Sequence, residues 1–447
     1  MIELLRIIFV LSKWRIWSYI GRQHISTPIY IILLLIEWLF IPIRKRSISS
    51  ALRELGPIYI KFGQVISSSP NLVGEEVAKS LSGLQDKLPP FPAKKAISIL
   101  EGEIGAKIEE IFQKFEHQPI AAASIAQVHK AILKNGEIVA VKILRPGIEK
   151  EYAKNIKLLY FLCRIAKYIL PLKYDRFRSK ELIDIFNETM QIELDMKAEA
   201  SLCLKMANNL AMEDIVVIPN VYLEYTSRKV LVTSFVDGIS IYDKDALIAS
   251  GWSPDVVAER LAVLFFNQIF RDGFFHADPH PGNIIVTKDN RIALIDFGIM
   301  GKLSDKERIG LAEIVYSILK SDYEKVAKIH IKLGYVAEDV NIGLFAESCR
   351  DICEPLIQQK TINEISIGKL LEKLLKMSAD FNMKPQHQLF LLQKTIIVLE
   401  GIAKLLNPNA NMWKVAEPWI KKWAIKNISP EAKFFRFLKK IFNELME

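Results

Sequence analysis

The sequence has few cysteines, and none of them is arranged as a disulfide or thiolate metal site. Its four cysteines are Cys163, Cys203, Cys349 and Cys353, and all lie in apolar helical patterns. None forms a Cys-x-x-Cys pair, and the spacing of Cys349 and Cys353 is typical of two small core residues of one helix. We therefore expect no disulfide framework and a reducing compartment.

Long apolar runs are also absent. Met1–Ile20 is apolar but carries three basic residues, and Pro28–Ile43 contains Glu37 and ends before Arg44-Lys45-Arg46. The second run, about 16 residues, is shorter than the about 20 that span a bilayer. No small-residue cleavage site follows, so we expect no secretory signal. We predict two interfacial helices with basic flanks; the alternative is that they pack on the protein's own body.

Charge is unbalanced, since lysine and arginine exceed the acids by nine. This excess favours an anionic partner, namely a nucleotide, acidic lipid or nucleic acid, although solubility and a bias toward lysine explain it equally. The basic residues concentrate at the apolar ends of the chain rather than along one stripe. We therefore expect an anionic membrane lipid as a partner and no nucleic acid.

The secondary-structure pattern predicts an α+β protein. Asn135-Gly136 between the apolar runs of Ile120–Leu144 is a strong hairpin signal. The other predicted elements are a helical stretch over Ile148–Met212, strands near Val216–Leu223 and Lys229–Phe235, a hinge at Asp237-Gly238, and a helical remainder interrupted by strands at Ile284–Val286 and Ile292–Ile295. A small β-containing lobe thus precedes a larger helical lobe.

Three oxygen-bearing side chains suggest phosphoryl transfer. Asp278 and Asn283 form an Asp-x4-Asn loop, and Asp296 begins an Asp-Phe-Gly thirteen residues after Asn283. Asp278 suits a base or orienting group, while Asn283 and Asp296 suit Mg²⁺ ligands. Hard cations prefer such oxygens, which disfavours zinc at His276 and His280. We expect these histidines to brace the loop by hydrogen bonds to the backbone.

A lysine for the phosphates is expected on an upstream strand, and Lys142 in Val-Ala-Val-Lys meets that expectation. Taken alone, Lys142 is equally an edge-strand lysine that points to water. A helical glutamate should pair with it. Glu193 and Glu199 lie six positions apart in one predicted helix, on opposite faces, and position alone selects neither.

The phosphate-covering loop lacks glycine. Kinases place Gly-x-Gly-x-x-Gly between the first two strands, whereas this chain has an alanine-rich run at that place. Alanine is small but largely loses positive φ, so the loop should be stiffer and contact phosphates differently. The run comprises Ala121, Ala122, Ala123, Ser124, Ile125, Ala126, Gln127 and Val128.

The segment after Gly298 is short. Only five residues separate it from Ser304-Asp305-Lys306-Glu307, which has the pattern of a capping box at a helix start. A protein kinase needs a long activation segment ending in Ala-Pro-Glu to bind its peptide substrate. We therefore expect that the chain does not phosphorylate peptides.

These motifs, in this order, resemble the UbiB family of atypical kinase-like proteins linked to ubiquinone biosynthesis. The resemblance covers about residues 50–400. It rests on the Lys61-Phe62-Gly63-Gln64 signature, the alanine-rich loop, Lys142, the Glu193-x-Asp195 and Glu199-Ala200 motifs, His276–Asn283 and Asp296-Phe297-Gly298.

The resemblance implies a role for each site residue. Lys142 is the phosphate lysine with Glu199 as its partner, Asp278 the catalytic aspartate, and Asn283 and Asp296 the metal ligands. Glu193 and Asp195 meet Lys61 and Gln64 over the nucleotide site, where the Lys-x-Gly-Gln element covers the entry of a protein substrate. In two places the chain departs from the family: Ser68–Asn71 lacks the usual charges, and the C-terminus is basic and amphipathic rather than two apolar spans.

We therefore expect a protein-kinase-like, two-lobed fold that binds Mg²⁺ with ATP or ADP between its lobes. The predicted segments are membrane-associating helices 1–50, a Lys-x-Gly-Gln extension 51–115, an N-lobe 116–237, a C-lobe 238–405 and C-terminal helices 406–447. The expected function is an ATPase or atypical kinase at the cytoplasmic face of the bacterial inner membrane, acting with quinone precursors or quinone-biosynthesis enzymes.

Two alternatives to this function differ in kind. A nucleotide-binding pseudokinase would organise quinone-biosynthesis enzymes without doing chemistry. A quinone-ring hydroxylase is disfavoured, because the sequence has no dinucleotide Gly-x-Gly-x-x-Gly after a strand, no haem cysteine motif and no convincing non-haem iron triad.

Overall fold

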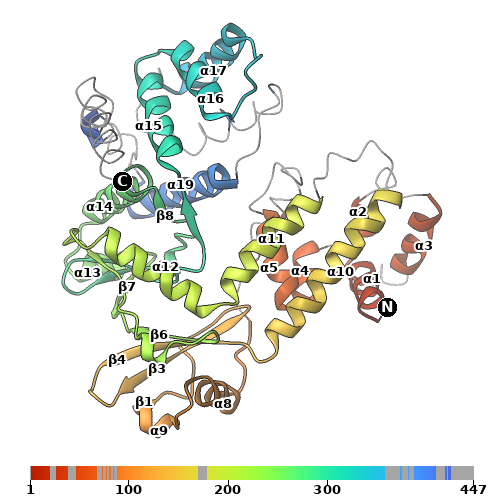
Figure 1. Ribbon diagram of the computed structural model, residues 1–447, viewed down its shortest axis with the longest axis vertical. Coiled ribbons are helices and arrows are strands. Elements are labelled where there is room, and N and C mark those ends of the chain that lie inside the picture. The colour runs from red at the N-terminus through yellow and green to blue at the C-terminus, as the bar shows by residue number, and fades with distance from the viewer. Residues whose placement is uncertain are drawn as a thin grey trace, which may run out of the picture. The chain divides into compact units, whose positions relative to one another are not determined.

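The structure is a computed structural model, and its chain divides into two compact units that are described separately. The first unit comprises Met1–Ser201 and Asn220–Phe235, and the second comprises Leu202–Pro219 and Val236–Glu447 (Figure 1). The described residues are 2–20, 27–38, 47–67, 73, 77, 80–81, 84, 88–169, 179–357, 373–374, 381, 387–408, 418–419 and 421–423. The five predicted segment boundaries stay a prediction.

The first unit combines helices with one antiparallel sheet. Its helices are α1 (Ile2–Lys13), α2 (Trp17–Ile20), α3 (Thr27–Trp38), α4 (Ile48–Leu55), α5 (Pro57–Ser67), α8 (Ala93–Ile104), α9 (Ile108–Ile111), α10 (Ile148–Ile169), α11 (Ser179–Glu193) and α12 (Met196–Asn209), which continues into the second unit. Its strands are β1 (Phe112–Phe115), β2 (Ala121–Ala122), β3 (Ala126–Leu133), β4 (Ile138–Leu144) and β6 (Val230–Ser234), and the turn Leu223–Tyr225 is a 3-10 helix.

The sheet of the first unit has the order β1-β3-β4-β6, with β2 added to β3. The predicted hairpin is confirmed, because Ile132 pairs with Ile138 and Gly136 takes a φ of 89° between the two strands. Alternate residues of β4, namely Val139, Val141 and Ile143, are fully buried against α8 and its neighbours. This alternation leaves Lys142 on the other face of the sheet.

The N-terminal helices pack on the first unit with one face and expose the other. Ile7 and Val10 of α1 are buried, and Glu54 of α4 accepts hydrogen bonds from Lys13 and Trp14. Glu37, which interrupts the apolar run of α3, accepts from the Trp17 and Ser18 backbone N–H groups at the start of α2. The outer faces of α1 and α3 are apolar and more than half exposed; they carry Leu5, Phe9, Ile31, Ile32, Leu35 and Trp38.

Among the described residues, no helix is both long enough and apolar enough to cross a bilayer. The basic flank Arg44-Lys45-Arg46 and the divergent Ser68–Asn71 lie outside the described residues.

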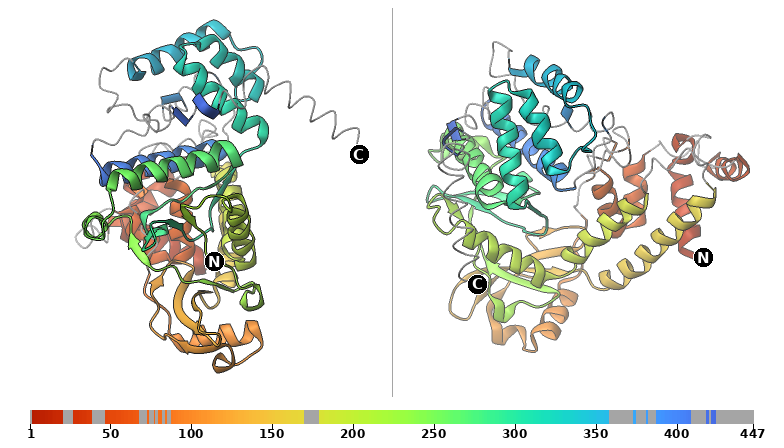
Figure 2. Two further views of the ribbon diagram at one scale, coloured as in Figure 1. Left: turned by 90° about the vertical axis from the view of Figure 1, so that its left-hand side faces the viewer. Right: turned by 45° about the horizontal axis from the view of Figure 1, so that its top comes forward.

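The second unit is mostly helical, with short sheets (Figure 2). Its helices are α13 (Lys244–Ala249), α14 (Pro254–Phe266), α15 (Asp305–Leu319), α16 (Tyr323–Leu333), α17 (Ile342–Ile357) and α19 (His387–Leu406), with a π-helical turn at Asn267–Asp272 and a 3-10 turn at Pro281–Asn283. Its strands are β5 (Val216–Val217), β7 (Gly238–Ser240), β8 (Phe274–His276), β9 (Ile284–Thr287), β10 (Ile292–Leu294) and β11 (Met300–Lys302).

The two predicted strands of the second unit at 284–286 and 292–295 are confirmed as the β9–β10 hairpin. They lie in a sheet of order β5-β10-β9-β7, and β8 pairs with β11 separately. The strand predicted over Val216–Leu223 is wrong in length. Only Val216–Val217 is extended, and Leu223–Tyr225 forms a 3-10 turn.

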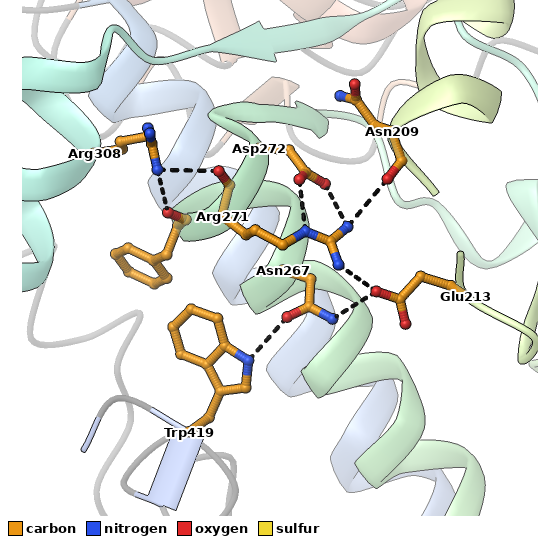
Figure 3. Close-up of polar contacts among 8 residues, drawn as sticks. Asn209, Glu213, Asn267, Arg271, Asp272, Arg308 and Trp419 are labelled. Carbon is orange, nitrogen blue, oxygen red and sulfur yellow. Dashed lines mark hydrogen bonds and ion pairs between the residues drawn. The ribbon is translucent and has the colours of Figure 1, made fainter. Parts of the chain in front are cut away.

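Arg271 ties the π-helical turn to the end of α12 (Figure 3). Its guanidinium donates to Asp272, to Glu213 and to the Asn209 carbonyl, and the hydrogen bond to the Asp272 carboxylate raises the pKa of Arg271. Arg308 of α15 donates to the Phe270 and Arg271 carbonyls. A π-turn leaves carbonyls without their usual helical partners, and these guanidinium groups satisfy two of them. The network fixes the backbone that leads into β8.

The aromatic residues of the C-terminal segment pack on this same turn. Trp419 Nε1 donates to Asn267 (Figure 3), and Trp419 and Trp423 pack against Phe270. Trp423 is buried within the second unit, so these two rings pack on the body of that unit. The rest of the predicted C-terminal helices, residues 424–447, lies outside the described residues.

The cysteines predict a reactivity pattern. All four are free thiols, Cys163 is partly exposed, and burial raises the pKa of Cys349 and of Cys353 to about 12. Since only the thiolate is nucleophilic, we expect Cys163 to react with Ellman's reagent in the native protein while Cys349 and Cys353 react only after unfolding. A Cys163→Ser variant should therefore lose the fast reaction of the native protein with Ellman's reagent. Fast labelling of Cys349 in the native variant would contradict the burial.

Candidate functional site

The β9–β10 hairpin brings the two predicted metal ligands of the second unit together. Leu294 pairs with Ile284, and the next residue, Ile295, donates its N–H to the Asn283 carbonyl at 3.0 Å. Asp296 is the next residue, so its backbone lies close to that of Asn283. The Asn283 amide nitrogen donates to the Asp278 carbonyl at 3.2 Å, so the carboxamide oxygen is the atom with which Asn283 would bind a cation.

His276 connects the Asp278 loop to the same hairpin. Its Nδ1 accepts from the Asp278 N–H at 3.3 Å, so the ring proton sits on Nε2, which donates to the Ile295 carbonyl at 3.2 Å. His280 Nδ1 accepts from the Gly282 N–H. The prediction that both histidines brace the loop through the backbone is confirmed, and His276 is buried.

Asp296 adopts a strained backbone conformation. Its φ is 63°, a region that residues other than glycine seldom enter, and its carboxylate accepts from the Gly298 N–H. Such strain collects at sites where the surrounding structure holds a side chain in one direction. Here the Ile295 hydrogen bond to Asn283 and the β11 pairing on the other side hold it.

The donor set fits Mg²⁺ bound with a nucleotide. Mg²⁺ prefers oxygen ligands and is commonly held by one or two carboxylates together with phosphates, and Asn283 and Asp296 offer such oxygens. Within the described ranges, no group of three or more histidine, cysteine or acidic side chains forms a metal site by itself. A metal here would thus depend on phosphate ligands as well.

Asp278 has a partner that the sequence did not reveal. Lys394 Nζ of α19 lies 3.0 Å from its Oδ1. No sequence signal marks Lys394, because a lysine on an amphipathic helix is usually a solvated residue. Lys394 also lies 116 positions from Asp278 in the sequence.

In the first unit, Lys142 pairs with Glu199. Lys142 stands on β4 between Val128 of β3 and Leu231 of β6, and its Nζ lies 2.7 Å from Glu199 Oε1 and 2.9 Å from Oε2. The Glu199 side chain is 4% exposed and that of Lys142 is 18% exposed. The pair is therefore largely removed from water. Its role toward a nucleotide stays a prediction.

The prediction that Glu193 and Glu199 share one helix is wrong. Helix α11 ends at Glu193, and Asp195 starts α12 by accepting from the Lys197 and Ala198 N–H groups. This side-chain capping competes with a continuous helix. Because the chain turns here, the two glutamates reach different cations, and Glu193 lies 2.8 Å from Lys61 instead.

The Lys-x-Gly-Gln segment forms part of α5, with Lys61 and Gln64 one turn apart. Gly63 between them is buried, and a Cβ there would lie 2.5 Å from Leu52 and 2.7 Å from Leu84. A Cβ at this position would therefore force the ends of the Leu52 and Leu84 side chains to shift. The packing of Gly63 sets the direction in which Lys61 reaches Glu193.

The alanine-rich loop is held by the body of the first unit. Arg145 donates to the Ala123 carbonyl, and its own N–H donates to the Ile125 carbonyl. Ser124 is fully buried and its hydroxyl has no hydrogen-bond partner, the kind of orphaned group that a ligand or water satisfies. The Gln127 amide is bound to the Phe91 backbone, so this side chain is already engaged within the first unit.

The segment after Gly298 is as short as predicted. It forms β11 against β8 and then enters α15, where Ser304 and Glu307 form the predicted capping box. Gly301 lies over the Phe275 ring, with no room for a side chain. Residues 297–304 thus contain no peptide-binding activation segment.

The fold and this arrangement of motifs define a protein-kinase-like protein. A family model of the ABC1 atypical kinase-like domain matches residues 83–330, and one of the UbiB helical domain matches residues 349–411. The chain belongs to the UbiB family of atypical kinases, which is involved in ubiquinone biosynthesis.

Relatives are similar along most of the chain. A protein of Marinobacter nauticus is 38% identical over 96% of this chain and 79% of its own length, and one of Azotobacter vinelandii is 36% identical over 96% and 82%. Both carry the name probable protein kinase UbiB. The Mycobacterium tuberculosis protein Rv3197, solved with erythromycin, has a similar fold, with a TM-score of 0.56 and 24% identity over 88% of this chain and 97% of its own.

The Lys142–Glu199 pair predicts a stability effect. Lys142→Met removes the ammonium beside a buried carboxylate, so we expect a loss of about 3 kcal/mol in the free energy of unfolding. Lys142→Met combined with Glu199→Leu should recover part of this loss. Lys134→Met, in the exposed hairpin turn, is the control and should change little. Urea denaturation followed by tryptophan fluorescence measures each, and equal losses for Lys142→Met and the control would refute the buried-pair argument.

Proposed function

We propose that the protein is a Mg²⁺-dependent ATPase, or a kinase of a small or lipid-like acceptor, that supports isoprenoid quinone assembly. The observation that carries this proposal is the joint placement of Asp278, Asn283 and Asp296 by one hairpin and one histidine. A single aspartate in a loop would be weak evidence for any reaction. Phosphoryl transfer requires a base and two cation ligands close together, and here one hydrogen-bond network connects all three residues.

Each of these residues has its own task in the proposal. Asn283 and Asp296 would hold Mg²⁺, which when bound neutralises charge on the phosphates. Asp278 accepts the proton of the attacking hydroxyl. Within the first unit, the ammonium of Lys142, held by Glu199, and the unsatisfied hydroxyl of Ser124 are the groups that suit phosphate oxygens.

The short segment at 297–304 supports a non-peptide acceptor. The strand β11 and the capped start of α15 occupy the chain directly after Asp-Phe-Gly. A peptide substrate would have no platform there. Water, a small molecule or a lipid headgroup needs none.

We expect the catalytic and binding roles to separate on mutation. Asp296→Asn should abolish the Mg²⁺ dependence of nucleotide binding, whereas Asp278→Asn should keep binding and lower hydrolysis by about a hundredfold or more. Calorimetric titration with ATP analogues and a phosphate-release assay measure the two effects. Lys404→Met, on the exposed face of α19, serves as control. If the wild-type protein binds no nucleotide at any Mg²⁺ concentration, the proposal is refuted.

The cellular form of this test separates an enzyme from a scaffold. Quinone and its precursors are quantified in a deletion strain carrying either the wild-type protein or Asp278→Asn. An enzyme predicts that precursors accumulate with the variant. Full rescue by Asp278→Asn would favour a nucleotide-binding scaffold instead.

We further propose that the protein associates with the cytoplasmic face of the inner membrane through the outer faces of α1 and α3. Six large apolar side chains there are more than half exposed. In the sequence, the basic run Arg44-Lys45-Arg46 begins six positions after Trp38, the last residue of α3. Exposed apolar side chains together with basic residues in the same stretch of sequence favour binding to anionic lipid at the interface, without a span.

Membrane binding should respond to charge on α3. We expect Leu35→Glu combined with Trp38→Glu to weaken flotation with phosphatidylglycerol vesicles by about tenfold or more, because both exposed side chains would otherwise enter the lipid. Leu344→Glu is the matched control, since Leu344 is an equally exposed leucine of the second unit. Vesicle binding that is equal in both variants would count against this surface.

A further inference from the structure

The loop that carries Asp278 has no lysine or arginine of its own. Residues 276–283 contain neither lysine nor arginine. A phosphoryl group in transfer carries negative charge on its oxygens, and enzymes place cationic groups around it in addition to the metal. A side-chain cation for this loop must come from elsewhere in the chain.

Lys394 brings such a charge to the loop. Its Nζ lies 3.0 Å from Asp278 Oδ1, and both residues belong to the second unit. Lys394 stands on α19, inside the segment matched by the helical-domain family model. The helical segment that follows the kinase-like domain thus contacts its catalytic aspartate.

The exposure of this ion pair argues for a chemical role. The side chains of Lys394 and Asp278 are 34% and 38% exposed, and pairs that face water to this degree contribute little to the stability of a fold. The second unit does not need the pair to hold α19, because Leu391, Thr395 and Leu399 are buried along the same helix. The ammonium is therefore presented to solvent beside the group that takes up the proton.

Helix α19 also holds Lys394 in place. It packs along α14 (Figures 1 and 2). It also contacts β11, where Gln388 accepts the Lys302 N–H at 3.1 Å. One helix thus contacts the loop that carries Asp278 and the strand that follows Asp296. A charged group on a packed helix is positioned more accurately than one on a loop.

We propose that Lys394 is a catalytic residue for phosphoryl transfer, an inference that rests on the proposed function. In the resting protein its ammonium orients the Asp278 carboxylate. In the reaction the oxygen of water or of an acceptor hydroxyl bonds to the γ-phosphorus while its proton passes to Asp278. The bond from that phosphorus to the bridging oxygen breaks, and ADP leaves with the electron pair. Once Asp278 is protonated, the Lys394 ammonium donates to an oxygen of the transferred phosphoryl group.

Steady-state ATP hydrolysis by the full chain with Mg²⁺ and phosphatidylglycerol vesicles tests this role. We expect Lys394→Met and Lys394→Gln each to lower kcat by about tenfold to a hundredfold, with KM for ATP changed by less than about threefold. Lys394→Arg, which keeps the charge, should recover much of the lost rate. Lys404→Met on the exposed face of the same helix should match the wild-type protein.

The outcomes distinguish this inference from the function on which it rests. Absence of ATP binding and hydrolysis in the wild-type protein refutes both. Hydrolysis by the wild-type protein with an unchanged kcat in Lys394→Met refutes only the role of Lys394. A rise in KM at constant kcat assigns Lys394 to ground-state binding of ATP and likewise overturns the proposal. If neither Met nor Gln folds as judged by circular dichroism, the pair is structural and the proposal fails.

Discussion

The site of the second unit depends on the two hydrogen bonds of the His276 imidazole. One ring nitrogen accepts from the Asp278 N–H and the other donates to the Ile295 carbonyl, next to Asp296. A neutral ring with its proton on Nε2 makes both bonds at once, whereas a doubly protonated ring has no acceptor for Asp278. Burial of the ring in the core keeps water from replacing either bond. One buried side chain thus links the loop of Asp278 to the segment of Asp296.

In the first unit, ion pairs that are shielded from water hold the predicted site residues in place. Lys142 with Glu199 and Lys61 with Glu193 are both enclosed pairs whose glutamates are buried. An ammonium held by a buried carboxylate keeps a fixed direction, at the expense of desolvating both groups. The alanine-rich loop is also held in place, because Arg145 donates to its carbonyls and Ser124 is buried. A glycine-rich loop closes on a nucleotide by bending, and this loop has little freedom to do so.

The segments outside the kinase-like domain contribute to both units. In the second unit α19 reaches Asp278 through Lys394 and β11 through Gln388, so a helix that is absent from the motif region takes part in the site. In the first unit α1 and α3 bury one face and leave an apolar face outward. Their sequence suggested either interfacial helices or helices packed on the body. The buried faces show the packing, and an interfacial role for the outer faces stays a proposal.

The sequence alone determined the features that depend on local chemistry. Asn135-Gly136 specified a hairpin, Ser304 with Glu307 specified a helix start, and the motif order identified the kinase-like family. Only the tertiary structure decided which charges meet. The helix break at Asp195 separates Glu193 from Glu199, and Lys394 reaches Asp278 across 116 positions. Periodicity describes one helix at a time, whereas an ion pair between distant segments depends on how those helices pack, and that packing follows from the whole core.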